Sequence, residues 1–554
     1  MMDFGRLTHL ASQTWTSTCG HLRNLRKTFL GFAAAQAGKA SPWRSALRAG
    51  SGAVLLGLAL GGCQDWGDGA EGPDALTVML TEAPRGMDPA NHTATLTGTV
   101  LAPMYEGLVR TSGGATEPLL ASGWTQSADG LDWTFLLRPG VRFHDGAPMN
   151  AQAVVVTFQR LIDPASALAA AGKFRPVIAS VQALDDRTVR FHLTRPYADF
   201  LILLGANQAA IVSPRAVRAG TIATVADGTG PFRFVAWRPN VSVTEARNRD
   251  YWGAAPLLRS IRWLSSAEPS VLNMALRNGL ADVAGPLSPV FAPRMARDPA
   301  LRLIHQSGHA FFWVALDTRL PPFDDARVRQ ALSYATDRAG LVSALLSGFG
   351  QPAAAPLADA TPYVARDPEH VGYDLAKARQ LLAASGHASG LHIAVAVQDS
   401  DEAPAEALQA MWAKAGVDLE IRRLEGGVYA AAAFAGPKDK ARQGLGGVLA
   451  SWSSGVVPEL QLRPLFASVN AAPAGANLGF FADAQVDRML DEAEAARSDD
   501  ERARLYHAVQ ARIIDQAPDV LLFTRDDLVG LRRGVSGVTI APDGVILVAR
   551  AAKA

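Results

Sequence analysis

The fold of this chain is decided by the stretch Asp129-Gly-Leu-Asp-Trp-Thr-Phe-Leu-Leu-Arg-Pro-Gly-Val-Arg-Phe-His-Asp-Gly-Ala-Pro148. Aromatic and aliphatic residues are concentrated in Trp133–Arg138, which predicts a strand. Pro139-Gly140 predicts a turn, because proline presets the backbone of one turn position and glycine tolerates positive φ. We expect the strand to resume at Val141–Phe143 and to end at a second turn, His144-Asp145-Gly146.

Outside this stretch, strand and helix patterns alternate along the chain. A helix is expected at Ala151–Leu161, and Thr188–Leu193 alternates apolar and polar residues as a half-buried strand does. No internal repeat is found. The pattern predicts an α/β protein of two or more lobes. The helices expected in the second half span residues 326–336, 339–347, 375–385, 405–415, 484–495 and 500–515.

Composition and charge limit the class of protein. The chain has 554 residues, of which 49% are hydrophobic and 19% charged, so it can form large cores and is not generally disordered. The part after residue 63 suffices for about three domains of roughly 150 residues each. The net charge is +1 and no basic stripe is present, so nothing indicates nucleic-acid binding.

A short apolar run, Gly52-Ala-Val-Leu-Leu-Gly-Leu-Ala-Leu-Gly-Gly-Cys63, follows Arg44 and Arg48. It is too short to cross a bilayer as a helix, which takes about 20 apolar residues. The order of charge, apolar core and small residues before a cysteine resembles a bacterial lipoprotein signal, in which Cys63 is lipidated and becomes the new N-terminus. The alternative is a short buried segment with an incidental cysteine.

This resemblance divides the N-terminal region into two parts. Residues 1–62 are expected to be a leader or signal, and residues 63–75 a lipidated cysteine with a flexible linker. Because such signals run about 15–30 residues, we interpret the early part of 1–62 as an extension from a misassigned translation start. Cys19 and Cys63 are the only cysteines. The large body is expected to need no disulfide in an oxidising compartment.

No pattern in the chain assembles an enzyme site. Gly67–Gly72 fits GxGxxG but follows no strand, and GxxxxGK(S/T), HExxH and GxSxG are absent. His305 and His309 lie four residues apart, yet the residues between them indicate a turn, and no nearby Glu or Cys completes a metal site. The acid pair Asp526-Asp527 is interpreted as part of a turn or helix start. We therefore expect no enzyme activity, no cofactor and no metal.

Several further segments have to be read together with the opening stretch. That stretch runs into Ala153–Phe158, and the other segments are, in order, Tyr105–Val109, Val181–Leu193, Gly228–Phe232, Asn248–Trp252, Pro322–Arg338 and Tyr373–Leu382. Together they resemble the extracellular solute-binding proteins of family 5, the peptide- and nickel-binding components of ABC importers. The resemblance covers nearly everything from Leu76 to the C-terminus.

The resemblance implies an α/β, two-lobed periplasmic binding protein fold of type II, with an extra inserted domain and a ligand cleft between the lobes. The expected division is lobe I at residues 76–103, 216–318 and 526–554, the inserted domain at 104–215, and lobe II at 319–525. Crossing strands are expected near Leu316–Leu320 and Phe523–Asp527. The lobes are expected to close around the ligand by hinge motion.

The ligand residues are sought around Gly447-Val-Leu-Ala-Ser-Trp-Ser-Ser-Gly455. Peptide-binding relatives carry a Gly-Trp pair here and, soon after it, an aspartate that holds the peptide's amino group. This chain keeps Trp452 but has Ser451 before it and no aspartate after it. A buried amine without a carboxylate is costly, so either Glu459 substitutes or the ligand is neutral, anionic or sugar-like. The candidate ligand residues are Trp452, Ser453, Ser454, Gly455, Glu459, Glu82 and Phe523.

Most of these candidates have a structural alternative. Trp452 and Phe523 could belong to the core, because large aromatic side chains are usually buried. Ser453 and Ser454 could simply be polar loop residues. Glu82, at the exit of the first strand, could be a solvated surface acid.

These observations predict a monomeric, extracytoplasmic protein, lipid-anchored to a bacterial membrane, that captures a peptide or peptide-like solute and delivers it to ABC permease subunits. The alternative is a ligand sensor or peptide chaperone that feeds no transporter. A hydrolase on the same fold is less favoured, because nucleophile motifs are missing. Peptide is favoured over nickel, since no His or carboxylate cluster could hold a metal directly. An opine, a sugar and a chelated metal are left open as ligands.

Overall fold

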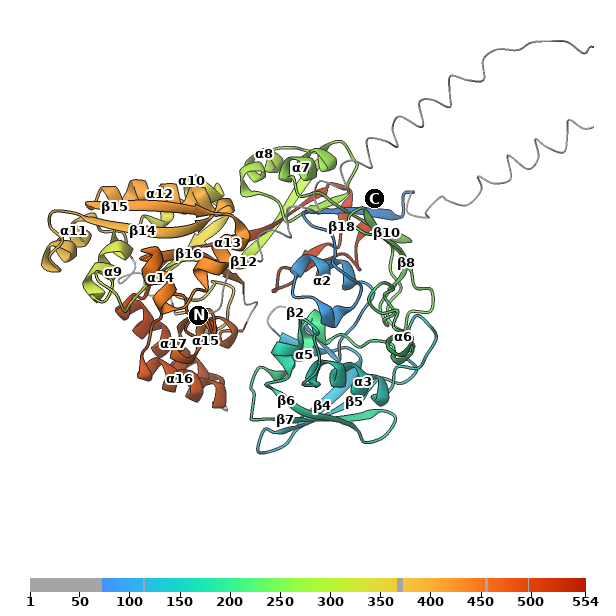
Figure 1. Cartoon of the computed structure of the whole chain (residues 1–554). Coiled ribbons are helices and arrows are strands. Elements are labelled where there is room, and N and C mark those ends of the chain that lie inside the picture. The colour runs from blue at the N-terminus through green and yellow to red at the C-terminus, as the bar shows by residue number, and fades with distance from the viewer. Residues whose placement is uncertain (1–71, 113–114, 366–371, 454–456, 497) are drawn as a thin grey trace, which may run out of the picture. The chain divides into compact units, whose positions relative to one another are not determined.

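The chain folds around one large mixed sheet (Figure 1). The computed structural model describes residues 72–112, 115–365, 372–453, 457–496 and 498–554. Eleven strands of these described ranges share the sheet, whose two ends belong to two different lobes. In spatial order they are β15 (Val417–Leu424), β14 (Leu391–Gln398), β16 (Gly447–Ser453), β12 (Leu301–Leu316), β17 (Asp519–Arg532), β11 (Val283–Gly285), β1 (Ala75–Leu80), β10 (Ser260–Ser265), β9 (Ser242–Arg247) and β8 (Phe232–Arg238), with β13 (Gly350–Pro352) also paired to β17.

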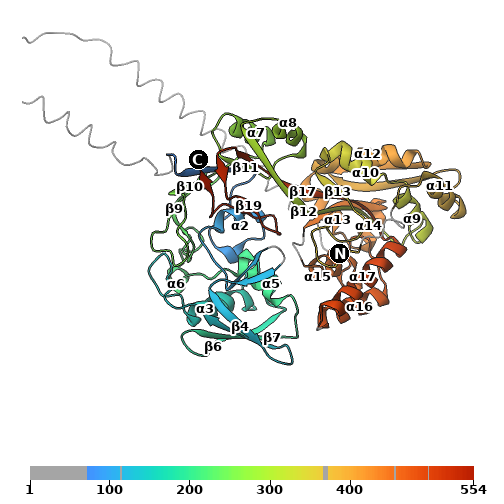
Figure 2. The same ribbon diagram turned by 180° about the vertical axis from the view of Figure 1, so that it is seen from behind.

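Lobe I is built on β1, which runs parallel to both β10 and β11. One face of this part of the sheet packs on α2 and the C-terminal segment, and the other on α7 and α8, as Figure 2 shows from behind. Near the C-terminus the short strand β20 pairs with β19. The remaining elements are η1 (Pro89–Asn91), α2 (Thr95–Leu101), α7 (Pro269–Arg277), η3 (Pro289–Phe291), α8 (Ala292–Ala296), β18 (Val535–Ser536), β19 (Thr539–Ile540), β20 (Ile546–Leu547) and β21 (Ala552–Lys553).

The inserted domain carries a four-stranded sheet in the order β4-β5-β7-β6 and a separate hairpin, β2-β3. Its core is aromatic: Phe158 and Phe191 meet edge to face at 4.9 Å between ring centroids. Such pairs stabilise a core beyond the area they bury. The elements are β2 (Val109–Ser112), β3 (Ala115–Pro118), β4 (Ala121–Gln126), β5 (Asp132–Leu137), α3 (Ala151–Ile162), α4 (Ala171–Phe174), β6 (Ile178–Ala183), β7 (Thr188–Leu193), α5 (Phe200–Gly205), η2 (Asn207–Ala209) and α6 (Pro214–Ala219).

The opening stretch is a strand followed by a folded loop. The strand predicted at Trp133–Arg138 is β5, but Val141–Phe143 forms only an isolated bridge, between Arg142 and Pro148. The loop is held by Asp145 instead of by a ladder. Its carboxylate accepts hydrogen bonds from the Ala147 amide at 2.7 Å and the Ser213 hydroxyl at 2.6 Å.

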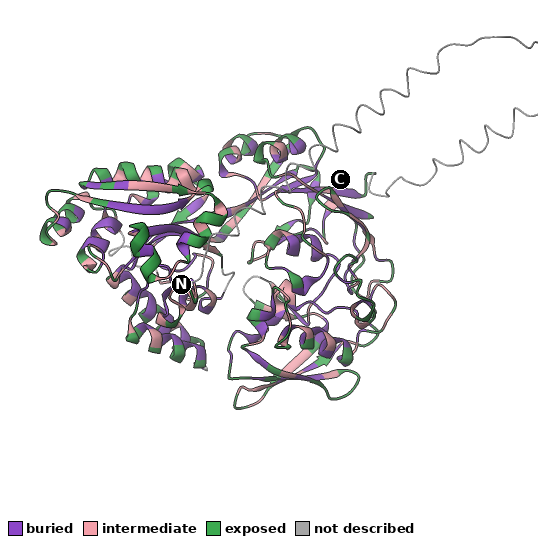
Figure 3. Ribbon diagram, in the orientation of Figure 1, coloured by how far each residue is buried: buried purple, intermediate pink, exposed green. Residues whose placement is uncertain are grey.

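Lobe II has helices on both faces of its sheet, and burial follows the inner sides of these layers (Figure 3). Three of its helices begin at capping aspartates, because the carboxylates of Asp325, Asp337 and Asp374 accept hydrogen bonds from backbone amides of the first turns. The helices on one face are α9 (Ala326–Tyr334), α10 (Arg338–Leu346), α11 (Leu375–Ala384) and, after η4 (Asp399–Asp401), α12 (Glu402–Ala413); the others are α13 (Gly426–Ala433), α14 (Pro437–Gln443), α15 (Glu459–Phe466), η5 (Ser468–Asn470), α16 (Ala484–Ala495) and α17 (Asp499–Gln516).

Several of the sequence motifs meet at one buried carboxylate, that of Glu106. It accepts hydrogen bonds from the Tyr251 hydroxyl at 2.6 Å, the Trp252 indole at 2.8 Å and the Thr229 hydroxyl at 2.8 Å. Burial raises the pKa of Glu106, and these three donors oppose the rise. The motifs at 105–109, 228–232 and 248–252 therefore act in the fold, where they join the inserted domain to lobe I.

Two long strands, β12 and β17, connect the lobes as an antiparallel pair, which we call the crossing ribbon. Leu301 of β12 packs in the core under α7 and α8, whereas Phe311 of the same strand packs in a lobe II core. The ladder is interrupted between Gln306 and Ala310. The first crossing therefore lies within β12, ahead of the expected Leu316–Leu320.

The crossing ribbon also corrects two local predictions. The segment between His305 and His309 belongs to β12 and is no turn, and Asp526-Asp527 lies within β17, at neither a turn nor a helix start. The glycine of the first segment, Gly308, is needed for the close packing of the two strands. A Cβ at this residue would lie 1.9 Å from the Arg525 carbonyl oxygen, so only glycine allows the two strands to approach this closely.

Candidate ligand site

Trp452 lies near the end of β16, where the sequence predicts the ligand wall. It stands opposite Phe311 of β12 in an antiparallel ladder. The side chain is half-buried and packs against the lobe II core. Its indole Nε1 donates a hydrogen bond to the Leu460 carbonyl oxygen at 3.0 Å, which fixes the ring's orientation. An oriented, partly exposed indole is suited to packing on a ligand.

Two tyrosines on the same core are half-buried in the same way, Tyr363 and Tyr429. The Tyr429 hydroxyl donates to the Leu449 carbonyl oxygen of β16 at 2.7 Å. Tyr363 stacks on Tyr506, with ring centroids 5.8 Å apart. We call Tyr363, Tyr429 and Trp452 the aromatic rim. The sequence analysis missed both tyrosines, because partial exposure of an aromatic residue is set by tertiary packing and leaves no local pattern.

Glu459 occupies a different environment from a ligand anchor. It is 5% exposed at the start of α15, and its carboxylate pairs with Arg463 and accepts a hydrogen bond from the Tyr506 hydroxyl at 3.2 Å. Burial raises the pKa of Glu459 to about 7, against the opposing charge of Arg463. Protein groups thus already satisfy this carboxylate. Ser453 is exposed at the end of β16, and Ser454 and Gly455 lie outside the described residues.

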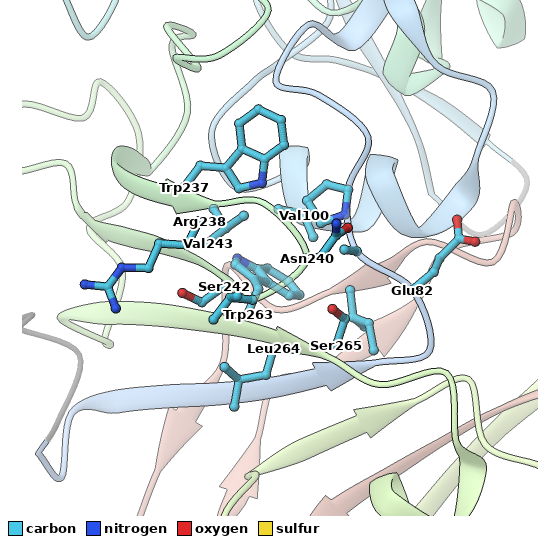
Figure 4. Close-up of a pocket in the computed structure, with 14 residues that line it drawn as sticks. Glu82, Val100, Trp237, Arg238, Asn240, Ser242, Val243, Trp263, Leu264 and Ser265 are labelled. Carbon is cyan, nitrogen blue, oxygen red and sulfur yellow. The ribbon is translucent and has the colours of Figure 1, made fainter. Parts of the chain in front are cut away.

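Glu82 is half-buried in a shallow pocket made only by lobe I segments (Figure 4). Trp237, Asn240 and Trp263 also line this pocket, from β8, the following turn and β10. The structure does not bring Glu82 together with the aromatic rim. Cys63, the predicted lipidation site, lies outside the described residues.

Phe523 is buried in β17 and stacks on Phe312 at 4.8 Å between ring centroids. Phe523 therefore takes the core position that the sequence analysis gave as the alternative to a ligand contact. Its neighbours Thr524 and Asp526 are more polar than a core requires. Thr524 Oγ1 and Asp526 Oδ1 are buried and have no hydrogen-bond partner within the described ranges, while Asp526 Oδ2 lies 3.2 Å from His305 Nδ1. Unpaired buried oxygens are uncommon, so these two make the crossing ribbon a polar region distinct from the aromatic rim.

Metal and membrane sites were also sought in the part of the chain that the structure describes. It contains no group of three or more His, Cys, Asp or Glu residues placed to hold a metal ion. Nor does it contain a helix both long enough and apolar enough to cross a membrane.

Comparison with known proteins decides the family. The model of the protein family described as "Bacterial extracellular solute-binding proteins, family 5 Middle" matches residues 115–459. The chain belongs to this family. Among curated family 5 proteins, it is 30% identical over 469 residues to the glutathione-binding protein GsiB of Pectobacterium atrosepticum, covering 82% of this chain and 90% of that protein. It is 31% identical to heme-binding protein A of Haemophilus influenzae, covering 80% and 85% of the two chains.

Solved structures confirm the two-lobed fold of this family 5 protein. HbpA2 from Haemophilus parasuis superposes with a TM-score of 0.78 at 26% identity, covering 86% of this chain and 99% of the other. The periplasmic binding protein DppA from Helicobacter pylori, in complex with the peptide STSA, gives a TM-score of 0.71 at 26% identity, covering 86% and 98%. Family 5 proteins bind solutes outside the cytoplasm for ABC transporters.

Proposed function

We propose that this family 5 protein captures a peptide or peptide-like solute between its lobes, against the aromatic rim, and passes it to an ABC permease. The observation that carries the proposal is Trp452, half-buried and oriented through its bond to Leu460. The named ligands of its relatives, glutathione and the peptide STSA, support the solute class. We further propose that the protein acts by binding alone and not as an enzyme.

The ligand end that meets Trp452 is proposed to carry no free amino group. Glu459 is the carboxylate nearest along the chain, and Arg463 and Tyr506 already occupy it. A charged amine buried beside Trp452 could therefore not use Glu459 as its counter-charge, and burying an unpaired charge is costly. Blocked, neutral or anionic peptide-like solutes fit this wall better than free dipeptides do.

A thermal-shift panel tests the solute class. Ligand binding stabilises the folded state by an amount that grows with ligand concentration. N-acetylated di- to pentapeptides should raise the melting temperature more than glutathione and the same peptides with free amino ends do. The Trp452→Ala variant should lose the shift. A shift with opines or sugars but with no peptide would contradict the proposal.

Transport and anchoring are separate parts of the proposal. We propose that Cys63 is lipidated and holds the protein at a bacterial membrane, facing away from the cytoplasm. A Cys63→Ala chain should then lose incorporated lipid label and leave the membrane fraction. Deletion of the cognate permease should abolish uptake of the identified solute. Unchanged uptake would favour the sensor or chaperone alternative.

A further inference from the structure

A short segment of the inserted domain, Arg195–Asp199, joins β7 to α5 and contacts lobe II. Asp199 Oδ1 lies 2.7 Å from a guanidinium nitrogen of Arg502 on α17. Arg195 pairs with Glu494 on α16. The partners are 303 and 299 residues apart in sequence. Both ion pairs therefore connect separately cored parts of the molecule.

The contact between Asp199 and Arg502 is buried although both groups are charged. Asp199 is 5% exposed and Arg502 8% exposed. Tyr197 is also buried, and burial together with the carboxylates of Asp199, Glu459 and Glu494 raises the pKa of its hydroxyl. Tyr197 packs in the core of the inserted domain, and two of the carboxylates that raise the pKa of its hydroxyl, those of Glu459 and Glu494, belong to lobe II. A segment that buries a carboxylate against an arginine of another lobe is docked there and not merely adjacent.

The docked segment lies on a network of charges within lobe II. Arg463 is close to three carboxylates, those of Glu459, Asp491 at 2.8 Å and Glu494 at 3.4 Å. Arg502 is flanked by the rings of Tyr363, at 5.5 Å, and Tyr506, at 5.9 Å. Tyr363 belongs to the aromatic rim. The docking surface and the proposed ligand wall therefore share a side chain.

We propose that Arg195, Tyr197 and Asp199 form a latch that docks on α16 and α17, stabilises the closed arrangement of the lobes and so raises ligand affinity without contacting the ligand. The latch rests on the proposed function, because only a protein that closes around a solute gains affinity this way. When the lobes part, Asp199 and Arg502 both return to water. The population of the closed state then sets the apparent affinity, which falls with the fraction of binding-competent molecules.

The latch can be tested on the full chain without any ligand. Cys19 and Cys63 are the only cysteines, so a Cys19→Ser, Cys63→Ser background is free of native thiols. Cysteines introduced at Leu184, 51% exposed in the inserted domain, and Val469, 76% exposed in lobe II, carry nitroxide labels. Double electron–electron resonance then gives the distance distribution between the two lobes.

We expect Asp199→Asn and Arg502→Gln to shift the main population to longer distances. The matched control is Arg512→Gln, on the same helix, whose partner Asp483 lies 2.7 Å away within lobe II. It should leave the distribution unchanged. The exchanged pair Asp199→Arg with Arg502→Asp should restore part of the short-distance population. A parent-like distribution in both single variants would overturn the latch.

A milder variant guards against misfolding. Arg195 is half-exposed, with 50% of its side-chain surface accessible, so Arg195→Gln should fold normally and still shift the distribution. No shift in a folded Arg195→Gln protein would contradict a role for this pair. If the variants open the molecule but no peptide binds the parent, the proposed solute class fails while the latch stands. If peptides bind the parent and every variant equally well, the latch fails and the proposed function stands.

Discussion

The crossing ribbon and the latch both link the lobes, but by different kinds of interaction. In the ribbon, backbone hydrogen bonds join β12 and β17 as an antiparallel ladder, and each strand runs from one lobe to the other. Gly308 lets the two strands approach closely. The latch depends on side-chain charges contributed by residues about three hundred positions apart. A backbone ladder persists when lobes rotate, whereas a buried ion pair is either formed or broken. The ribbon is therefore suited to act as the hinge, and the latch to distinguish its two states.

The largest effect is expected at the ribbon, from Gly308→Ala. The added Cβ would clash with the Arg525 carbonyl oxygen, so the strands must separate, at a cost of about 3 kcal/mol in the free energy of unfolding. Urea denaturation measures this change. Gly172→Ala is the control, because nothing lies within 4 Å of its Cβ position. Equal stabilities of the two variants would show that the ribbon is not closely packed.

The latch should show energetic coupling between the lobes. Removing either partner of the buried Asp199–Arg502 pair leaves an uncompensated charge, so Asp199→Asn and Arg502→Gln should each cost about 2–3 kcal/mol. The double variant should cost much less than the sum, because the pair is lost only once. Thermal denaturation of all four proteins completes the cycle. Additive costs would mean that the two residues act independently.

The free energy of unfolding is expected to depend on pH through Glu459, which pairs with Arg463 in the charge network on which the latch docks. Its folded-state pKa, raised by burial to about 7, exceeds the ordinary value of 4.5. The folded protein thus holds this proton more tightly, so the contribution is fully present below pH 4.5 and is lost as pH rises through 7. Glu459→Gln should flatten the fall in stability between pH 5 and 7.5 by roughly 2 kcal/mol. A pH profile parallel to the parent's would contradict this assignment.

The smallest effect on stability is expected at Trp452 of the aromatic rim, which stands opposite Phe311 of the crossing ribbon. Trp452→Phe removes the donor to Leu460 and should cost about 1 kcal/mol of stability. Affinity for the identified solute should fall about tenfold, since a less firmly oriented ring packs on the ligand less well. Trp124→Phe in the inserted domain is the control and should leave affinity unchanged. Equal affinities of all three proteins would remove Trp452 from the site.

The sequence predicted best those features that neighbouring residues determine. The strand at Trp133–Arg138 and the helices at 326–336 and 375–385 depend on a few adjacent positions, and the structure confirms them. The motifs at 228–232 and 248–252 serve the fold, since Thr229, Tyr251 and Trp252 all donate hydrogen bonds to Glu106.

What the sequence could not give depends on residues far apart. The first crossing was placed too late, because the point where β12 changes cores is set by its register against β17, more than 200 residues away. Glu459 was one of two alternatives for the missing anchor, the other being a ligand without an amine, and in the structure helix α15 turns Glu459 toward Arg463 and Tyr506. The latch could not be predicted from the sequence for the same reason: Asp199 and Arg502 are 303 residues apart, and only the fold joins them.

Native mass spectrometry of the protein purified from its own host tests the central claim most directly. The account predicts one small, peptide-like solute bound per chain, released on denaturation and lost in the Trp452→Ala variant. Purified protein that carries no solute, and that none of the glutathione or peptide panel stabilises, would contradict it.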